Sequence, residues 1–332
     1  MANMRDVARA ANVSVSTVSY AFNGNPNIST ATRQRIFKTA EALGYTAHLS
    51  KKMKTPQKRS SIGLFLATFY SSYYHYMAEE MAEYSHKNYH NSLRVFIDYE
   101  INCKDLTSLL YSSGVESAII LHYQITDEWI STLKDCGIPL IFLDREITDD
   151  KVSSVLVDNY QGMCAQIEYL IRTGHKRIAF IKGDNGYDDR KRYLAYVDTL
   201  KKHFLPIDNT LILQGNFSYF ITKHNLARAH PSFSNIPDAI CCCNDEMAVA
   251  CIEAFEQAGY SIPEDISICG FDNLYYSSIS KIPLTTVINP IRAISRKAVD
   301  EAIRLLEEGE HGKCELIPAE FVVRDSTAAR NK

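Results

Sequence analysis

Short hydrogen-bonding side chains are concentrated in one stretch near the start of this 332-residue chain. They belong to Ser14, Thr17, Ser19 and Asn23. Side chains of this size can hold phosphate oxygens, and at helical spacing they would surround the outward-facing Val15, Ser16 and Tyr20. Small or polar residues on the outer face of a helix can reach base edges in a DNA groove. The stretch therefore predicts DNA contact, with the solvated face of an ordinary helical bundle as the alternative.

A second set of polar and aromatic side chains follows the predicted strands of the remaining chain. Its members are Tyr73, Tyr74, Asp144, Arg145, Arg192, Phe217, Asn244 and Asp272. Asp, Asn and Arg are suited to fixing hydroxyl groups, and aromatic faces stack on the apolar side of a sugar ring. We expect this set to bind a small molecule. The aromatic residues of 69–76 could instead belong to a core or an interface, and Asp245 could simply cap its helix.

Three short helices are needed to present the first group. The periodicity of apolar residues predicts them at 4–11, 15–22 and 30–43. Ser14 and Ser29 precede the second and third helices and are suitable N-caps. The apolar stripe of the third helix ends with Leu43, and Gly44 stops the helix. Three helices in so short a segment, joined by tight turns, are typical of a helix-turn-helix domain.

Positive charge is also concentrated in this region. Residues 1–60 hold ten Lys and Arg against Asp6 and Glu41, a net charge of +8. Because the whole chain carries −3, the remainder carries −11. A basic head on an acidic body indicates a polyanionic partner for the head and a different task for the body.

Apolar strands alternate with helices along the body. Strands are expected at 62–67, 93–97, 118–121, 139–143, 177–181, 211–213, 239–243 and 266–270, and helices at 74–88, 160–173, 188–203 and 245–258. This alternation predicts parallel sheets covered on both faces. Two such runs in tandem favour two doubly wound lobes, with a ligand site between them beyond the carboxyl ends of the strands.

Several classes of protein are disfavoured. No apolar run reaches the ~18 residues of a membrane span, and the start lacks a secretory apolar region. The nine cysteines include no C-x-x-C pair, which favours reduced, buried thiols in the cytoplasm. Residues 183–186 (GDNG) lack the lysine of a phosphate loop, and no histidine pair has metalloprotease spacing. We therefore expect no enzyme activity, no cofactor and no metal.

The head closely resembles the lactose/galactose-repressor (LacI/GalR) family of bacterial transcription regulators. The resemblance is carried by residues 5–19, RDVARAANVSVSTVS, and residues 40–45, AEALGY. It implies that Val15, Ser16 and Tyr20 read bases in the major groove. It also implies that Ser14, Thr17 and Asn23 hold phosphate.

The tether after this head departs from the family pattern. The family places a leucine wedge nine residues after the tyrosine, whereas this chain has Lys54 there, with Met53 the nearest apolar residue and Leu49 another. Apolar wedges unstack a base step and kink DNA, but a lysine contacts phosphate or a narrow groove. We therefore predict DNA contacts by Met53 and Lys54 that depend more on charge than on wedging.

The resemblance continues through the body. It is carried by CNDEMA at 243–248, IPEDIS at 262–267, GFDN at 270–273, LTTV at 284–287 and VRDST at 323–327. It implies a body like a periplasmic sugar-binding protein, in which the chain crosses between lobes near Asp158, Asn289 and Phe321. The expected divisions are a DNA-binding domain at 1–45, a hinge at 46–60, a first lobe at 61–158 plus 290–320, and a second lobe at 159–289 plus 321–332.

The small-molecule set also matches family effector positions, Asp272, Arg192 and Asn244 most closely. The combined expectation is a cytoplasmic homodimer that binds a pseudo-palindromic operator in double-stranded DNA. It would repress carbohydrate-utilisation genes and sense a small sugar. The alternatives are the same architecture sensing a nucleobase or nucleoside, and a sugar receptor or α/β enzyme with an accessory basic domain.

Overall fold

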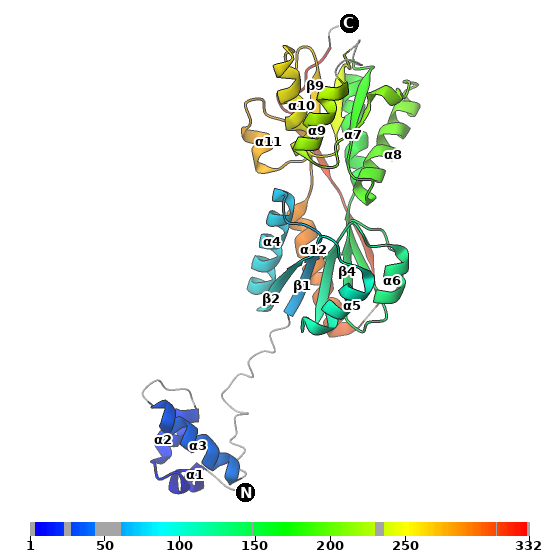
Figure 1. Ribbon diagram of the computed structural model, residues 1–332. Coiled ribbons are helices and arrows are strands. Elements are labelled where there is room, and N and C mark those ends of the chain that lie inside the picture. The colour runs from blue at the N-terminus through cyan, green and yellow to red at the C-terminus, as the bar shows by residue number, and fades with distance from the viewer. Residues whose placement is uncertain are drawn as a thin grey trace. The chain divides into compact units, whose positions relative to one another are not determined.

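A computed structural model describes residues 4–22, 28–43, 61–147, 149–229, 236–309 and 311–330 of the chain (Figure 1). The chain divides into two compact units, residues 1–59 and residues 60–332. No helix among the described residues is both long and apolar enough to cross a membrane.

The first unit contains three helices, α1 (Met4–Ala10), α2 (Val15–Phe22) and α3 (Thr30–Ala42). The predicted caps are confirmed, because the Ser14 hydroxyl accepts the Thr17 amide at 3.0 Å and the Ser29 hydroxyl accepts the Thr32 amide at 3.2 Å. The small core of this unit consists of Val7, Ala8, Ala11, Val18, Ala21, Ile36 and Ala40.

The prediction for one residue of the apolar stripe on α3 is wrong. Leu43 follows the end of α3 and is exposed, whereas the apolar Ile36 and Ala40 within the helix are buried. The helix ends before Leu43, so its side chain lies beyond the turn that faces the core.

The second unit is built on two six-stranded sheets. The first has the order β11-β5-β4-β3-β1-β2 and the second the order β12-β10-β9-β8-β6-β7. Every pair of neighbouring strands is parallel except β10 and β12. The strands are β1 (Ser61–Leu66), β2 (Ser92–Ile97), β3 (Ser117–Leu121), β4 (Leu140–Leu143), β5 (Ser153–Val157), β6 (Ile178–Lys182), β7 (Ile212–Gln214), β8 (Ala239–Cys242), β9 (Ser267–Asp272), β10 (Thr285–Ile288), β11 (Cys314–Ile317) and β12 (Glu320–Val322).

Helices cover both faces of the sheets, which is why most central strands are continuous apolar runs. On the first sheet, α4 and α12 share a core with one face, and α5 and α6 share a core with the other. In the second lobe α7 packs on α8 and α9 on α10 (Figure 1). The helices are α4 (Ser72–Tyr89), α5 (Cys103–Ser112), α6 (Asp127–Leu133), α7 (Asn159–Arg172), α8 (Tyr187–Lys202), α9 (Tyr219–Ala229), α10 (Asp245–Gln257), α11 (Tyr275–Ile279) and α12 (Ile291–Glu308), with a 3-10 turn at Asn209–Leu211.

The chain passes between the two sheets three times: from β5 to α7, from β10 to α12, and from β11 to β12. The last crossing falls earlier than the expected boundary at 320/321. Glu320 pairs with Ile288 of β10 and therefore belongs to the second sheet. Interleaving of this kind joins the two lobes through three connecting segments of the chain.

All nine cysteines are free thiols. Cys241, Cys242, Cys243, Cys251 and Cys269 lie in the core of the second lobe, as expected for small buried hydrophobes. Cys314 on β11 is the exposed exception, because β11 is an edge strand. Burial raises the pKa of the Cys241, Cys242 and Cys243 thiols, which keeps them protonated and unreactive.

Candidate functional site

The second helix of the first unit presents an exposed, chemically mixed surface. Val15 is 41 % exposed and Tyr20 is 52 % exposed, and Ser16 is exposed between them. Val18 and Ala21, on the opposite side of α2, are buried in the core. The helix is therefore held by one face and free to contact a partner with the other.

Two of the residues predicted to contact phosphate, Ser14 and Thr17, are hydrogen-bonded to each other at the start of this helix. The hydroxyls of Ser14 and Thr17 lie 2.7 Å apart, and Ser14 also caps α2. Both groups stay close to the amide groups of the first turn, where a helix attracts anions. Asn23, Met53 and Lys54, together with the hinge at 46–60, lie outside the described residues.

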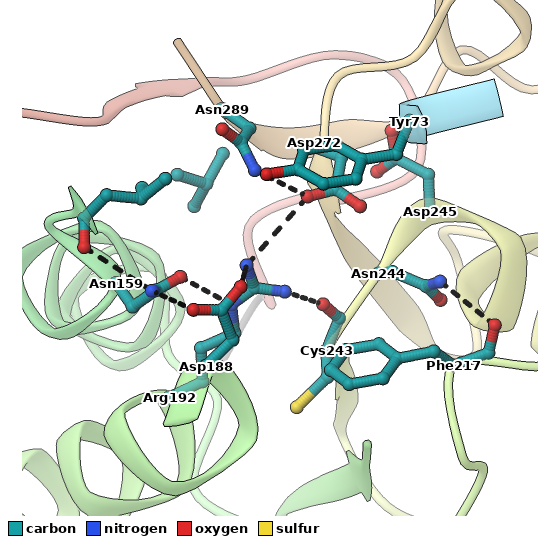
Figure 2. A network of polar contacts seen from close by, with 12 residues as sticks. Tyr73, Asn159, Asp188, Arg192, Phe217, Cys243, Asn244, Asp245, Asp272 and Asn289 are labelled. Atoms are coloured by element: carbon teal, nitrogen blue, oxygen red, sulfur yellow. Dashed lines mark hydrogen bonds and ion pairs between the residues drawn. The ribbon is translucent and has the colours of Figure 1, made fainter. Parts of the chain in front are cut away.

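In the second unit a buried arginine is the centre of a polar network (Figure 2). Arg192 on α8 is 2 % exposed, and its Nε donates to Asn159 Oδ1 at 2.8 Å. Its Nη2 lies 3.3 Å from Asp188 Oδ2 and 3.9 Å from Asp272 Oδ1. Nη1 donates to the carbonyl of Cys243. The guanidinium also lies 3.6 Å from the centre of the Phe271 ring. Three of the five N–H groups of Arg192 thus donate hydrogen bonds.

The acids around Arg192 titrate abnormally because they are buried together. Burial raises the pKa of Asp272 to about 6, although Arg192 and the Asn289 amide oppose this shift. Burial also raises the pKa of Asp188 and raises that of Asp144 well above its usual range, with neighbouring acids adding to the shift in both groups. Burial alone would lower the pKa of Arg192, but the carboxylates of Asp188 and Asp272 raise it. Arg192 therefore stays charged, and the carboxylates of Asp188 and Asp272 both interact with its guanidinium.

Residues of the first lobe approach the same network. Burial raises the pKa of the Tyr73 and Tyr74 hydroxyls, and the charges of Asp144, Asp188 and Asp272 raise both further. Tyr73 and Tyr74 lie at the start of α4, and Asp144 follows β4. The network therefore brings together strand ends and helix starts of both lobes.

Three residues of the predicted effector set have a left-handed backbone. The φ angles are +53° at Asp144, +53° at Phe217 and +110° at Asp272. Such conformations cost of order 1–3 kcal/mol each and are common where a site must be shaped precisely. Asp144 directly follows β4, Asp272 ends β9, and Phe217 lies three residues after the end of β7, so the three turns stand near the carboxyl ends of strands.

Asn244 and Phe217 are joined to each other and lie beside the arginine. Asn244 caps α10 by accepting the Met247 amide at 2.9 Å, and its Nδ2 donates to the Phe217 carbonyl at 3.2 Å (Figure 2). The Phe217 ring centre lies 5.9 Å from the Arg192 guanidinium. Gly183 lies so close to the end of this ring that any Cβ there would collide with it. The absence of a side chain at Gly183 therefore leaves room for the phenylalanine ring.

Arg145 is not brought into the network. Its Nη1 lies 3.0 Å from Asp127, and its Nη2 donates to the Ile125 carbonyl. The side chain is thereby held at the start of α6 in the first lobe. Asp245, for which helix capping was the alternative role, is buried and accepts the Leu274 amide at 2.8 Å and the Thr286 hydroxyl at 2.6 Å. The cap is Asn244, one residue earlier.

The structure adds three residues that the sequence reasoning did not include. Asp188, Asn159 and Asn289 all bind members of the network: Asn159 Nδ2 donates to Asp188 at 2.7 Å, and Asn289 Nδ2 donates to Asp272 at 3.1 Å. Asp188 could have been found, because it stands four residues before Arg192 in the same predicted helix. The two asparagines carry no comparable signal, since only the crossings between the lobes bring them here.

Within the described ranges no three or more His, Cys, Asp or Glu side chains are grouped so that they could hold a metal ion. The acids of the network surround an arginine instead of converging on one point. Hydrogen bonding and charge are the chemistry that the contacts of this network show.

Comparisons with known proteins agree with both units. Residues 3–48 match the family described as bacterial regulatory proteins, lacI family, and residues 167–327 match the periplasmic binding protein-like domain. The chain is 30 % identical to the probable HTH-type transcriptional repressor ExuR of Bacillus subtilis (strain 168), over 98 % of each chain.

Solved structures show the same fold. A Lac repressor dimer bound to operator and an anti-inducer is similar with a TM-score of 0.75 and 22 % identity, over 99 % of each chain. A complex of the transcriptional regulator CelR with cellobiose is similar with a TM-score of 0.73 and 22 % identity, over 98 % of this chain and 100 % of that one.

Proposed function

This chain belongs to the lacI family of bacterial regulatory proteins, and on that basis we propose that it is a repressor that binds a pseudo-palindromic operator as a homodimer. It is a DNA-binding transcription regulator and not an enzyme. The observation that carries the proposal is α2, whose buried face packs in a basic three-helix unit while Val15, Ser16 and Tyr20 stay exposed. Operator DNA places the site of action in the cytoplasm.

Selection of binding sequences from random duplexes by the full-length protein tests this proposal. We expect a two-fold related consensus, because one three-helix unit reads only a few base pairs and two units read two half-sites. Tyr20→Ala should reduce discrimination between consensus and random DNA, since a base contact is worth about 1–3 kcal/mol. Gln34→Ala, at an exposed position on α3, is the matched control. Enrichment of no sequence would refute the proposal.

The proposed effector is a small sugar bound between the lobes, and the regulated genes would serve carbohydrate use. Support comes from the contacts around Arg192, where amide and carboxyl groups face tyrosines and Phe217. Such groups hold hydroxyls and cover the apolar side of a sugar ring. A nucleobase is the alternative effector, because the same aromatic rings can stack on it.

Thermal-shift screening of the full-length protein distinguishes the two effectors. Mono- and disaccharides should raise the melting temperature without being converted, since binding to the folded state alone stabilises it. A shift with nucleosides instead would favour the alternative, and conversion of the ligand would refute the sensor. Footprinting on the selected operator with and without the ligand then shows whether the effector releases or strengthens DNA binding.

Exposed apolar side chains on both lobes support the homodimer. They are Tyr76 on α4, Val95 and Ile97 on β2, Phe220 and Ile221 on α9, and Tyr275 and Ile279 on α11. In Figure 1, α4, β2 and α11 lie at the same side of the second unit. Apolar groups gathered on one side of a molecule are typical of a protein interface. A second copy of this chain is the partner we propose for them.

A further inference from the structure

An ion pair joins the two lobes beside the Arg192 network. Lys191 Nζ on α8 of the second lobe lies 2.9 Å from Glu146 Oε2, in the segment that follows β4 of the first lobe. The Lys191 ammonium also lies 5.3 Å from the centre of the Tyr187 ring in the same helix. Because the two partners belong to different lobes, separation of the lobes must break the pair.

The ion pair borders a cavity of about 130 Å³ whose walls come from both lobes. The first lobe supplies Glu146 and residues of β5 and β11, and the second supplies residues at the starts of α7 and α8. Asn159 lines this cavity and also contacts Arg192 and Asp188 in the network. Movement of the lobes therefore changes the surroundings of the ion pair and of the network together.

A second contact shows that the lobes also meet at the start of α10. The Ser71 hydroxyl, which precedes α4 in the first lobe, donates to Glu246 Oε1 in the first turn of α10 at 3.2 Å. The same hydroxyl accepts the Tyr73 amide at 3.3 Å and so caps α4. The structure is thus a closed arrangement, in which the first lobe contacts the second at both α8 and α10.

Both contacts adjoin residues of the network in sequence. Lys191 directly precedes Arg192 within α8. Ser71 lies two residues before Tyr73. Because a helix moves as a rigid unit, a ligand that shifts Arg192 relative to the first lobe also shifts Lys191 relative to Glu146. The ligand and the ion pair therefore act on the same equilibrium between lobe arrangements.

We propose that the ion pair of Glu146 and Lys191 is a clasp, which holds the lobes closed independently of any ligand and thereby sets the basal affinity for the operator. The side chains of Lys191 and Glu146 are 36 % and 51 % exposed, so the pair contributes little to folding. An equilibrium between two arrangements of the same folded lobes is more finely balanced, and a weak contact present in only one arrangement shifts it. This role holds whichever effector the network binds, and it rests on the proposed function only where operator affinity is the readout.

Charge reversal in the full-length protein tests the clasp. Glu146→Lys and Lys191→Glu each bring like charges together, so both should change operator affinity by at least about threefold, in the same direction. The double variant restores a pair of opposite charges and should bind the operator within about 1.5-fold of wild type. Fluorescence anisotropy on the selected operator, at constant salt and without effector, measures the four affinities.

A general effect of charge on DNA binding gives a different pattern. Glu146→Lys makes the protein more positive and Lys191→Glu makes it more negative, so long-range attraction to DNA moves the two affinities in opposite directions. Glu168→Lys and Lys202→Glu are the matched controls, because this pair joins α7 to α8 within the second lobe at 2.6 Å. The controls should show no shift in a common direction. Unchanged affinities, opposite shifts or an unrestored double variant overturn the proposal.

Alkylation of Cys314 gives a readout that needs no operator. Cys314 is an exposed thiol that lines the same cavity. A bulky maleimide should label it at least about twofold faster in both single variants than in wild type and the double variant, because opening of the lobes uncovers the cavity wall. A direct effect of charge on the thiolate has opposite signs in the two variants. Equal labelling rates, measured by peptide mass mapping, overturn the clasp.

The two readouts separate failure of the clasp from failure of the proposed function. A protein that selects no operator but shows the expected labelling rates refutes the repressor and retains the clasp. A protein that binds its operator without the expected response to charge reversal refutes the clasp alone.

Discussion

At the scale of single residues, Arg192 decides how the second unit can work. A buried guanidinium that loses a partner leaves a charge uncompensated, which costs about 3–5 kcal/mol. Here the arginine has two acidic neighbours, an amide, a carbonyl and the Phe271 ring. It can therefore stay buried and charged in the absence of a ligand. The unfavourable consequences of this arrangement fall on the buried acids. Asp272 has both a raised pKa and a positive backbone φ angle.

Asp272 gives the first prediction. Its pKa of about 6 in the folded protein exceeds its ordinary value of 3.8, so the folded state binds more protons between these two pH values. The contribution of Asp272 to the free energy of unfolding is therefore lost as pH rises through this window. Relative to Asp272→Asn, the wild type should gain ~1 kcal/mol on acidification from pH 7 to pH 5, measured by urea unfolding.

The same comparison with Asp198→Asn, an acid of α8 far along the helix, should show no such gain. A stability gap between wild type and Asp272→Asn that stays constant from pH 7 to pH 5 would contradict the assignment.

At the scale of elements, α2 separates stability from recognition. Its first turn depends on the Ser14 cap, while Ser16 and Tyr20 of the same helix make no core contact. The elements of the body behave similarly, because the sheets bury the strands while the residues directly after them shape the polar network. In both units, the residues that stabilise the fold and the residues that we expect to bind a partner are neighbours in sequence.

The cap and the reading surface can be tested side by side. Ser14→Ala removes the acceptor for the Thr17 amide and should destabilise the headpiece by about 1 kcal/mol. Ser16→Ala should leave its stability within ~0.5 kcal/mol and weaken binding to the selected operator. Hydrogen exchange of the α2 amides reports the first effect and fluorescence anisotropy the second. Equal destabilisation by the two variants would contradict this division.

The tether gives a prediction from sequence alone, since Lys54 lies outside the described residues. If Lys54 contacts phosphate where the family has a leucine, Lys54→Ala should reduce the slope of log affinity against log salt by about one unit. Lys54→Arg keeps the charge and should keep the slope. The slopes come from operator titrations at several salt concentrations, and an unchanged slope in the alanine variant would refute the contact.

At the scale of the whole molecule, three crossings join two sheets whose strand ends meet at one network. Relative movement of the lobes must then change the surroundings of Arg192, and a ligand there can bias that movement. Coupling of about 1–3 kcal/mol between ligand and operator would alter DNA affinity several-fold to a hundredfold. Two copies of the chain are needed for such a change to act on two half-sites.

The homodimer can be weakened through one side of the body. Ile97→Asp on β2 and Ile279→Asp on α11 should each weaken association by about 1–2 kcal/mol, because a charge would be buried against a second copy. Tyr111→Asp on α5 is the control, since Tyr111 is 61 % exposed and α5 covers the face of the first sheet opposite to α4. Analytical ultracentrifugation measures the outcome. Dimers as stable as wild type in both variants would exclude this face.

Local patterns predicted the helices of the head, both serine caps and most central strands to within one or two residues. They missed β5, β10, β11, β12, α9, α11 and α12. The apolar residues of β5, β10 and α12 are buried only because a sheet brings distant elements beside them. Leu43 was predicted to belong to the third helix and Glu320 to the first lobe, and both predictions are wrong. The exact end of a helix or strand depends on the elements packed beside it.

The sequence by itself determined the basic head, the two-lobed body and the family, because periodicity, caps and motifs are local and survive without coordinates. It also supplied Arg192, Asp272, Asn244 and Phe217 as candidates for one site. Only the tertiary structure decided the balance of charge there. Asn159 and Asn289 join that site where the chain crosses between the lobes, while Arg145 is held elsewhere by Asp127. Charge at a buried site depends on which distant residues are packed together, and no local pattern contains that information.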